Sequence, residues 1–197
     1  MSNLKKFVNL GKKIVCVGKN YPENASDVNL PSIKKPIVFA KTTSSYLTEE
    51  LGVIIGKPAR NIAEGNALNH IGGYTIALDM LARDIQLELR KQGHPWYISK
   101  SFDTASPVGS FVSTESIPDP HNVEIYCLLN GETRQKSSTQ EMRMSIAFIL
   151  EYMSKFVTLE TGDLVLTGSP AGFGQCKSGD KLEIGITGIT SAKFEVE

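Results

Sequence analysis

A group of charged and polar side chains lies in the middle of this chain, between segments that have the composition of buried strands. The segment from Gly72 to Gly109, GGYTIALDMLARDIQLELRKQGHPWYISKSFDTASPVG, contains Asp79, Arg83, Gln86 and Lys100. Asp79 follows the apolar run YTIAL, so its carboxylate comes at the expected end of a strand. An unpaired charge is costly to bury, and charge in such a context therefore usually serves a ligand or a metal ion.

Two of these residues follow Asp79 at helical spacing. Arg83 lies four positions after Asp79 and Gln86 three positions further on, so one face of a helix can direct all three toward a single pocket. On the residues alone, two interpretations of Asp79 stay open: a metal ligand, and the N-cap of a helix that begins at Met80. On an ordinary surface helix, Arg83 and Gln86 would simply be solvated.

Lys100 has apolar neighbours. It lies in the run SKSF, close to Trp96, Ile98 and Phe102, and this pattern predicts a buried strand. An ammonium group in that position needs a partner or a function, because its desolvation is costly.

Short apolar runs predict the strands that position these side chains. They are brief and rich in β-branched residues. The four clearest are KIVCV (13–17), PIVF (36–39), LGVII (51–55) and YTIAL (74–78). The stretch of about 18–32 between the first two is rich in Asn, Pro and Ser, and it reads as a long loop or lid.

Two helices and a hairpin complete the prediction. Helical periodicity indicates helices over 80–91 and 145–156, and Gly93 followed by Pro95 would end the first one. The apolar run 123–129 leads into Asn130-Gly131, a strong hairpin signal. We therefore predict a single domain, residues 1–197, with a strand-rich mixed α/β fold.

Composition excludes several classes of function. The 21 basic and 21 acidic residues leave no net charge, so there is no bulk field to hold nucleic acid or an anionic membrane. No apolar run approaches the roughly 20 residues of a membrane span, and the first residues lack the apolar core of a secretory signal. We expect a mitochondrial or cytoplasmic protein that binds small molecules. The cysteines and histidines are isolated, which favours reduced thiols over a zinc site or a serine–histidine triad.

Several segments together resemble one family. The stretch from Gly72 to Gly109 and the runs KIVCVGKNY, ELGVIIGK and GDLVLTGSPAGFG resemble the fumarylacetoacetate hydrolase superfamily, in the same order and along nearly the whole chain. The closest likeness is to its domain-containing protein 1 group of acylpyruvases and oxaloacetate decarboxylase-tautomerases. The resemblance implies a rolled mixed β-sheet with a few short helices, a homodimer, and a Mg²⁺ or Mn²⁺ site for the adjacent oxygens of a 2-oxo acid.

The resemblance also assigns roles to individual residues. A hard divalent cation held by carboxylates, with a lysine or arginine beside it, stabilises the negative charge of an enolate. The matches to the family are the metal ligands Glu50 and Asp79, the catalytic and substrate-binding Lys100, and the substrate-binding Arg83, Gln86 and Ser169.

Two departures from the family pattern affect the same site. Family members have Glu-x-Glu just before Leu-Gly; here Glu50 matches the second glutamate, and Thr48 stands in place of the first. Roughly 15 to 20 residues are absent before this strand, so we expect a loop deletion or a break near 46–50. In the lid, Asn24 and Asp27 replace the family's catalytic histidine and glutamate. An amide cannot take a proton near neutral pH, which weakens proton transfer.

The resulting hypothesis is a metal-dependent hydrolase or lyase of small 2-oxo acids that works through a metal-stabilised enolate. Its reaction would be acylpyruvate cleavage, oxaloacetate decarboxylation or keto–enol tautomerisation. The last two are favoured because neither must activate a water nucleophile. The alternative is a catalytically impaired paralogue of the same fold that binds a dicarboxylate or a partner without turnover.

Overall fold

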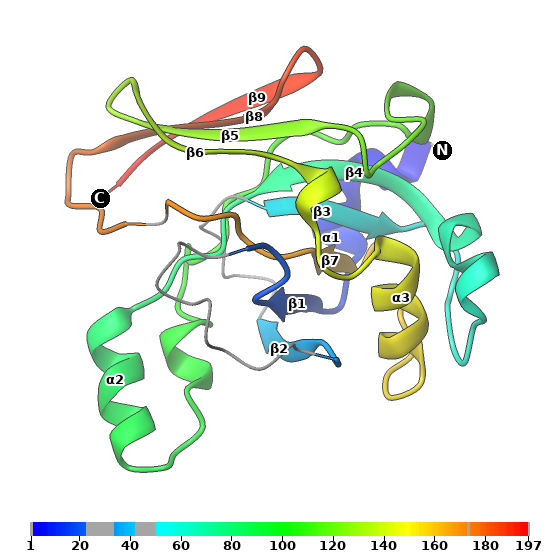
Figure 1. The fold of residues 1–197 in the computed structure, drawn as a ribbon, viewed down its shortest axis with the longest axis horizontal. Helices are drawn as coiled ribbons and strands as arrows, with labels where there is room; N and C mark the ends of the chain where they lie inside the picture. Colours follow the sequence, from blue (N-terminus) through cyan, green and yellow to red (C-terminus); the bar gives the residue numbers. More distant parts are fainter. Residues whose placement is uncertain (1, 23–33, 42–49, 173, 197) are drawn as a thin grey trace.

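Two β-sheets form the framework of the molecule. The computed structural model describes residues 2–22, 34–41, 50–172 and 174–196. The first sheet has the strand order β2-β1-β7-β3-β4 and the second has the order β6-β5-β8-β9. The second sheet lies across one side of the first (Figure 1). The strands are β1 (Ile14–Gly18), β2 (Ile37–Lys41), β3 (Glu50–Ile55), β4 (Ile71–Ala77), β5 (Glu124–Leu129), β6 (Glu132–Ser138), β7 (Leu164–Leu166), β8 (Lys181–Ile186) and β9 (Thr190–Glu195).

The helices are short and lie around the sheets. In Figure 1, α3 lies beside one end of the five-stranded sheet, and α2 projects from the other end. Within the described ranges, no helix combines the length and the apolar character that crossing a membrane requires. The α-helices are α1 (Phe7–Leu10), α2 (Arg83–Lys91) and α3 (Ile146–Ser154), and the 3₁₀ helices are η1 (Ser2–Lys6), η3 (Glu64–His70), η4 (Tyr97–Ser99), η5 (Thr114–Ser116) and η6 (Thr139–Glu141). The expected strand-rich mixed α/β fold is confirmed.

The inner strands β1, β7 and β3 of the five-stranded sheet are buried on both faces, whereas most of the edge strand β2 is exposed. One face packs against the second sheet and α3 in the main apolar core, to which Val15, Val53 and Val165 contribute. The opposite face forms a smaller cluster, to which Cys16 and Ile54 contribute. Strands that are buried on both faces read as continuous apolar runs rather than as alternating ones. This explains why KIVCV and LGVII stand out in the sequence.

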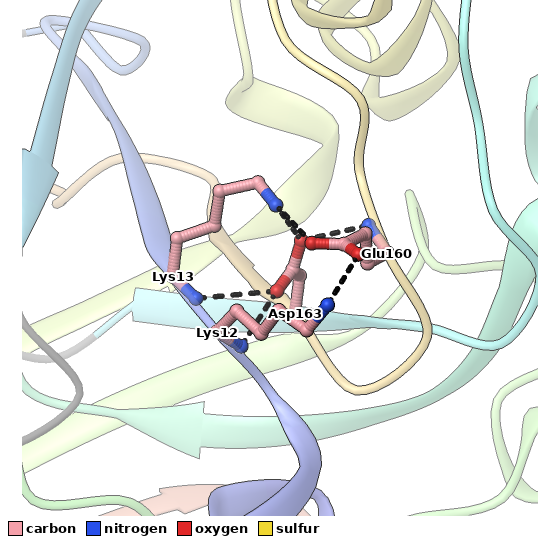
Figure 2. Close-up of polar contacts among 4 residues, drawn as sticks. All are labelled: Lys12, Lys13, Glu160 and Asp163. Carbon is pink, nitrogen blue, oxygen red and sulfur yellow. Dashed lines mark hydrogen bonds and ion pairs between the residues drawn. The ribbon is translucent and has the colours of Figure 1, made fainter.

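A buried carboxylate fixes the parallel pair β1 and β7, in which Ile14 is opposite Leu164. Figure 2 shows that Asp163, just before β7, binds Lys12 and Lys13, the two residues just before β1. Its Oδ1 accepts the backbone N–H groups of Lys12 and Lys13 at 2.9 and 3.2 Å. Its Oδ2 accepts the N–H of Glu160 at 2.7 Å and pairs with Lys13 Nζ at 2.6 Å. A fully buried charge satisfied by four donors sets the register of the two strands.

The predicted hairpin and thiols agree with the structure. Asn130 and Gly131, between β5 and β6, have φ of 52° and 86°, the left-handed values that a two-residue type I′ turn needs. All three cysteines are free.

The predicted bounds of both helices need correction. The first helix begins at Arg83 rather than at Met80, because Met80 N–H donates to Ala105 O at 3.0 Å and so extends strand pairing beyond β4. The second begins at Ile146, with the Ser145 hydroxyl accepting the N–H of Phe148 as the N-cap. It ends at Ser154 rather than at 156.

The environment predicted for Lys100 was also partly wrong. Lys100 is buried, but it follows the 3₁₀ helix η4 and is not part of a strand. Its neighbour Ile98 is 60% exposed, because a 3₁₀ turn directs successive side chains around an axis rather than to two faces. The apolar neighbours therefore do not form a strand core.

Candidate active site

Strand alternation places several charged groups on the face of the five-stranded sheet that carries the smaller cluster. Side chains two positions apart on a strand share a face. Glu50 starts β3 on the same face as Ile54, and Asp79 lies two residues beyond Ala77, which belongs to the smaller cluster. Lys41 ends β2, two residues after Phe39, which packs against that cluster. The charged groups thus border the smaller apolar cluster.

Asp79 lies between two lysines. Lys41 Nζ is 2.6 Å from Oδ1 and Lys100 Nζ is 2.5 Å from Oδ2. Lys41 Nζ also donates to Ala105 O at 2.9 Å. Burial lowers the pKa of Lys41, and the negative charge of Asp79 opposes that shift. Removing one member of such a network would leave an uncompensated buried charge, so the three groups depend on one another.

The two lysines differ in exposure. The side chain of Lys41 is fully buried, whereas that of Lys100 is 11% exposed. The Lys100 ammonium also lies 5.2 Å from the centre of the Phe39 ring, a cation–π distance. Lys100 is therefore the lysine better placed to meet a ligand, and Lys41 the one better placed to hold Asp79.

Both carboxylate oxygens of Glu50 accept hydrogen bonds from the segment that follows β7. Gly168 N–H donates to Oε2 at 2.6 Å and Ser169 Oγ donates to Oε1 at 2.8 Å. Burial raises the pKa of Glu50 to about 8, and the charge of Asp79 acts in the same direction. Gly168 has φ of 110°, and a Cβ there would lie 2.8 Å from Asn20 Cβ, so only glycine suits this approach.

Asn20 joins the end of β1 to two other segments. It is fully buried, and its amide donates to Thr167 O at 2.8 Å and to Met144 O at 3.1 Å. Its Oδ1 accepts the N–H of Met144 at 2.8 Å. Asn20 therefore fixes the chain where the predicted lid begins. The predicted lid residues Asn24 and Asp27, and Thr48 of the expected deletion, lie outside the described residues.

The structure brings together some of the predicted site residues and separates others. Ser169 contacts Glu50 and Lys100 contacts Asp79, and the charge of Asp79 acts on Glu50, so these four residues belong to one group, in which only Ser169 is partly exposed. Arg83, the first residue of α2, is exposed and Gln86 is partly buried. In the described part of the chain, neither makes a side-chain hydrogen bond or ion pair with Asp79. A shared helical face for the three residues was wrong, since Asp79 precedes the helix.

The structure excludes one of the two interpretations of Asp79. The N-cap of α2 is Ala82, which makes no side-chain cap bond. The Asp79 carboxylate instead accepts the two ammonium groups, so it is not a helix cap.

Sequence reasoning missed Lys41. Its signal was available, since Lys41 ends the run PIVFAK, and the cost of burying an ammonium applies there as it does at Lys100.

The donor set fits a hard divalent cation. Glu50 and Asp79 are buried close enough for the charge of Asp79 to raise the pKa of Glu50, a repulsion that a cation would relieve. Mg²⁺ is commonly held by one or two carboxylates, with water and substrate oxygens completing its shell. Each Asp79 oxygen accepts one lysine and keeps a second lone pair. Among the described residues, no group of three or more His, Cys, Asp and Glu side chains forms a cage.

Comparison with known proteins places the chain in a family. The model of the fumarylacetoacetate (FAA) hydrolase C-terminal family matches residues 13–197. The chain belongs to this family. It is 44% identical over 214 aligned positions to the mitochondrial oxaloacetate tautomerase of Caenorhabditis elegans, with 100% of each chain covered. It is 37% identical to the mitochondrial oxaloacetate decarboxylase of Dictyostelium discoideum, covering 98% of this chain and 97% of that one.

A solved structure of the same family has a closely similar fold. The fumarylpyruvate hydrolase of Pseudomonas aeruginosa, in complex with Mn²⁺ and pyruvate, superposes with a TM-score of 0.86 and 30% identity, covering 94% of this chain and 89% of that one. The expected family and the expectation of an enzyme are confirmed.

Proposed function

We propose that this chain is a divalent-metal-dependent enzyme of small 2-oxo acids whose main reaction is the keto–enol tautomerisation of oxaloacetate. The proposal rests on the buried group of Lys41, Asp79, Lys100 and Glu50, in a chain 44% identical to an oxaloacetate tautomerase over its full length. Tautomerisation moves a proton between carbon and oxygen, and negative charge develops on oxygen during the transfer. Preorganised ammonium groups in a site shielded from water stabilise such charge.

Each described residue has a role in this proposal. Glu50 and Asp79 would hold Mg²⁺ or Mn²⁺, and a bound cation supplies a Lewis acid that polarises the keto oxygen. Lys100 donates to the substrate oxygens, and Lys41 keeps Asp79 in place. The Ser169 hydroxyl donates to Glu50 in the structure, and its role toward the substrate carboxylate rests on the family resemblance alone. Arg83 and Gln86 remain candidate substrate residues through the family resemblance alone.

The choice of reaction follows from the lid sequence. Hydrolysis of an acylpyruvate requires a base that activates water, and the amide of Asn24 cannot act as that base near neutral pH. Tautomerisation requires no water nucleophile, so the replacement of histidine by Asn24 costs less in that reaction. Asp27 keeps a carboxylate in the lid and is the proposed proton carrier there. We further propose a homodimer that acts in mitochondria, the location given in the names of the relatives.

Parallel assays of purified protein test the reaction. With Mg²⁺ or Mn²⁺ present, the decay of the ultraviolet absorbance of enol oxaloacetate reports tautomerisation. Pyruvate release reports decarboxylation or acylpyruvate cleavage. We expect tautomerisation to be the fastest of the three. Acylpyruvate cleavage much faster than oxaloacetate turnover would contradict the assignment.

A binding measurement separates an enzyme from the impaired paralogue. Oxalate has the adjacent oxygens of an enolised oxo acid, and calorimetry should show that it binds more tightly when Mn²⁺ is present. An absence of metal-dependent oxalate binding would favour the paralogue. In that case, a gain of activity on Thr48→Glu or Asn24→His substitution would show that these positions are responsible.

A further inference from the structure

Beyond β4, the chain continues to pair with a second segment, and this pairing places one more side chain beside Asp79. Leu78 N–H donates to Pro107 O at 3.0 Å, and Met80 N–H donates to Ala105 O at 3.0 Å. Ala77 and Val108 form an antiparallel bridge in the same register. In that register, the residue directly opposite Asp79 is Ser106.

The pair of Asp79 and Ser106 is of the closer type. The hydrogen bonds join the pairs on either side of it, so Asp79 and Ser106 occupy a non-hydrogen-bonded position, where opposite side chains approach most closely. The Cβ atoms of such pairs lie about 4.5–5.5 Å apart and point to the same face. Rotation about one side-chain bond can therefore bring a serine hydroxyl to an aspartate oxygen. Pro107 supports this arrangement, since a residue before proline favours an extended backbone.

The Ser106 hydroxyl is buried without a bond. Ser106 is fully buried, and its Oγ has no hydrogen-bond partner within the described parts of the chain. Buried hydroxyl groups are nearly always hydrogen-bonded, so an exception requires an explanation. Nearby, Lys41 and Lys100 take one oxygen each of Asp79, and Lys41 also donates to Ala105, the residue before Ser106.

Charge explains why a neutral donor is useful at this position. Two ammonium groups on one carboxylate repel a divalent cation that approaches the same carboxylate. A hydroxyl group orients the carboxylate without adding positive charge. Hydrogen bonds from neighbouring groups to metal-binding carboxylates commonly tune metal affinity in this way.

We propose that Ser106 is a positioning residue for Asp79, whose hydroxyl donates to the Asp79 carboxylate while a divalent cation is bound there. This inference rests on the proposed function, because it assumes a cation at Asp79. In this role, the Ser106 hydroxyl lowers the stability of the metal-free protein and strengthens the binding of the cation.

Two measurements on Ser106→Ala test the inference, and neither depends on turnover. The first is thermal unfolding of the metal-free protein. Because alanine removes an unsatisfied hydroxyl, the melting temperature should be unchanged or higher by up to about 4 °C. The second is calorimetric titration with Mn²⁺ alone, in which we expect about 10- to 100-fold weaker binding. Ser106→Thr, which keeps the hydroxyl, should recover most of the affinity.

Ser154→Ala is a matched control with the opposite expectation. Ser154 is also buried, but its hydroxyl accepts the N–H of Ile62 at 3.1 Å and donates to Glu151 O at 2.9 Å. This substitution should lower the melting temperature and leave Mn²⁺ affinity unchanged.

The outcomes separate the two proposals. A lower melting temperature of metal-free Ser106→Ala would overturn the inference, because it would show a structural role. Unchanged Mn²⁺ affinity in that variant would overturn it as well, while the proposed function would stand. A wild-type chain that binds no Mn²⁺ would overturn both.

Discussion

Replacing Glu50 by glutamine should change how the stability of the metal-free protein depends on pH. The folded state raises the pKa of Glu50 from 4.5 to about 8, mainly through burial and then through the charge of Asp79. Between these values, the folded protein keeps a proton that the unfolded chain has released. The stability from this proton is therefore complete below about pH 4.5 and is lost as the pH rises through about 8.

The size of the effect follows from linkage. One proton of difference changes the free energy of unfolding by up to about 1.4 kcal/mol per pH unit. Over the two units from about pH 5.5 to 7.5, the contribution of Glu50 should thus fall by up to about 3 kcal/mol. Glutamine cannot titrate, and it can still accept the N–H of Gly168 and donate to the Ser169 hydroxyl. The Glu50→Gln variant should accordingly lose this part of the pH dependence.

Urea unfolding at several pH values, with a chelator present, measures the effect. The control is Glu132→Gln, at the start of β6, where the glutamate is exposed. It should keep the wild-type slope. With Mn²⁺ present, the Glu50 contribution to the free energy of unfolding should rise with pH instead of falling, because metal binding requires the ionised carboxylate and releases its proton. Parallel curves of stability against pH for wild type and Glu50→Gln would refute the reasoning.

Three further substitutions or treatments test other parts of the structure. Asp163→Ala leaves Lys13 and several backbone N–H groups without their buried acceptor, so chemical denaturation should show a loss of about 3–5 kcal/mol. Lys41→Met removes a donor to Asp79, and enol oxaloacetate turnover should fall about 10- to 100-fold, measured with saturating Mn²⁺. The Cys16 thiol should resist alkylation in the native protein and react after unfolding, as followed by mass spectrometry. Burial excludes the reagent. Burial also raises the pKa of the Cys16 thiol, and the charge of Asp79 raises it further. Rapid native labelling of Cys16 would contradict that burial.

The sequence predicted the strands better than the segments between them. Polar side chains are absent from residues 14–17 of the run KIVCV and from LGVII, because both faces of strands β1 and β3 are buried, and this signal is local. The start of α2 depends instead on a long-range contact, the bond from Met80 N–H to Ala105 O. Helical periodicity cannot reveal that residues 80–82 are held by another segment. The same contact explains why Asp79 ends a strand and does not cap a helix.

The residues of the candidate site likewise include some that the sequence identified and some that it did not. Glu50, Asp79, Lys100 and Ser169 were found through resemblance to family motifs, and the structure gathers them into one group. Lys41 was missed although its burial could be argued from the sequence.

Ser106 could not be found from the sequence, since its position opposite Asp79 depends on a register that only the fold defines. Local composition gives no reason to separate this serine from its neighbours in FDTASPVG.

The charges of the described groups suggest an order for binding. Burial raises the pKa of Glu50 to about 8 and so favours its protonated form in the metal-free protein, where two lysines contact the carboxylate of Asp79. The metal-free group then carries an excess positive charge, which favours an anionic oxo acid and opposes a cation. Cation binding must release the Glu50 proton, and a dicarboxylate beside Lys100 would offset the charge that the cation adds. Metal and substrate should therefore bind with positive coupling, which by linkage strengthens both equally.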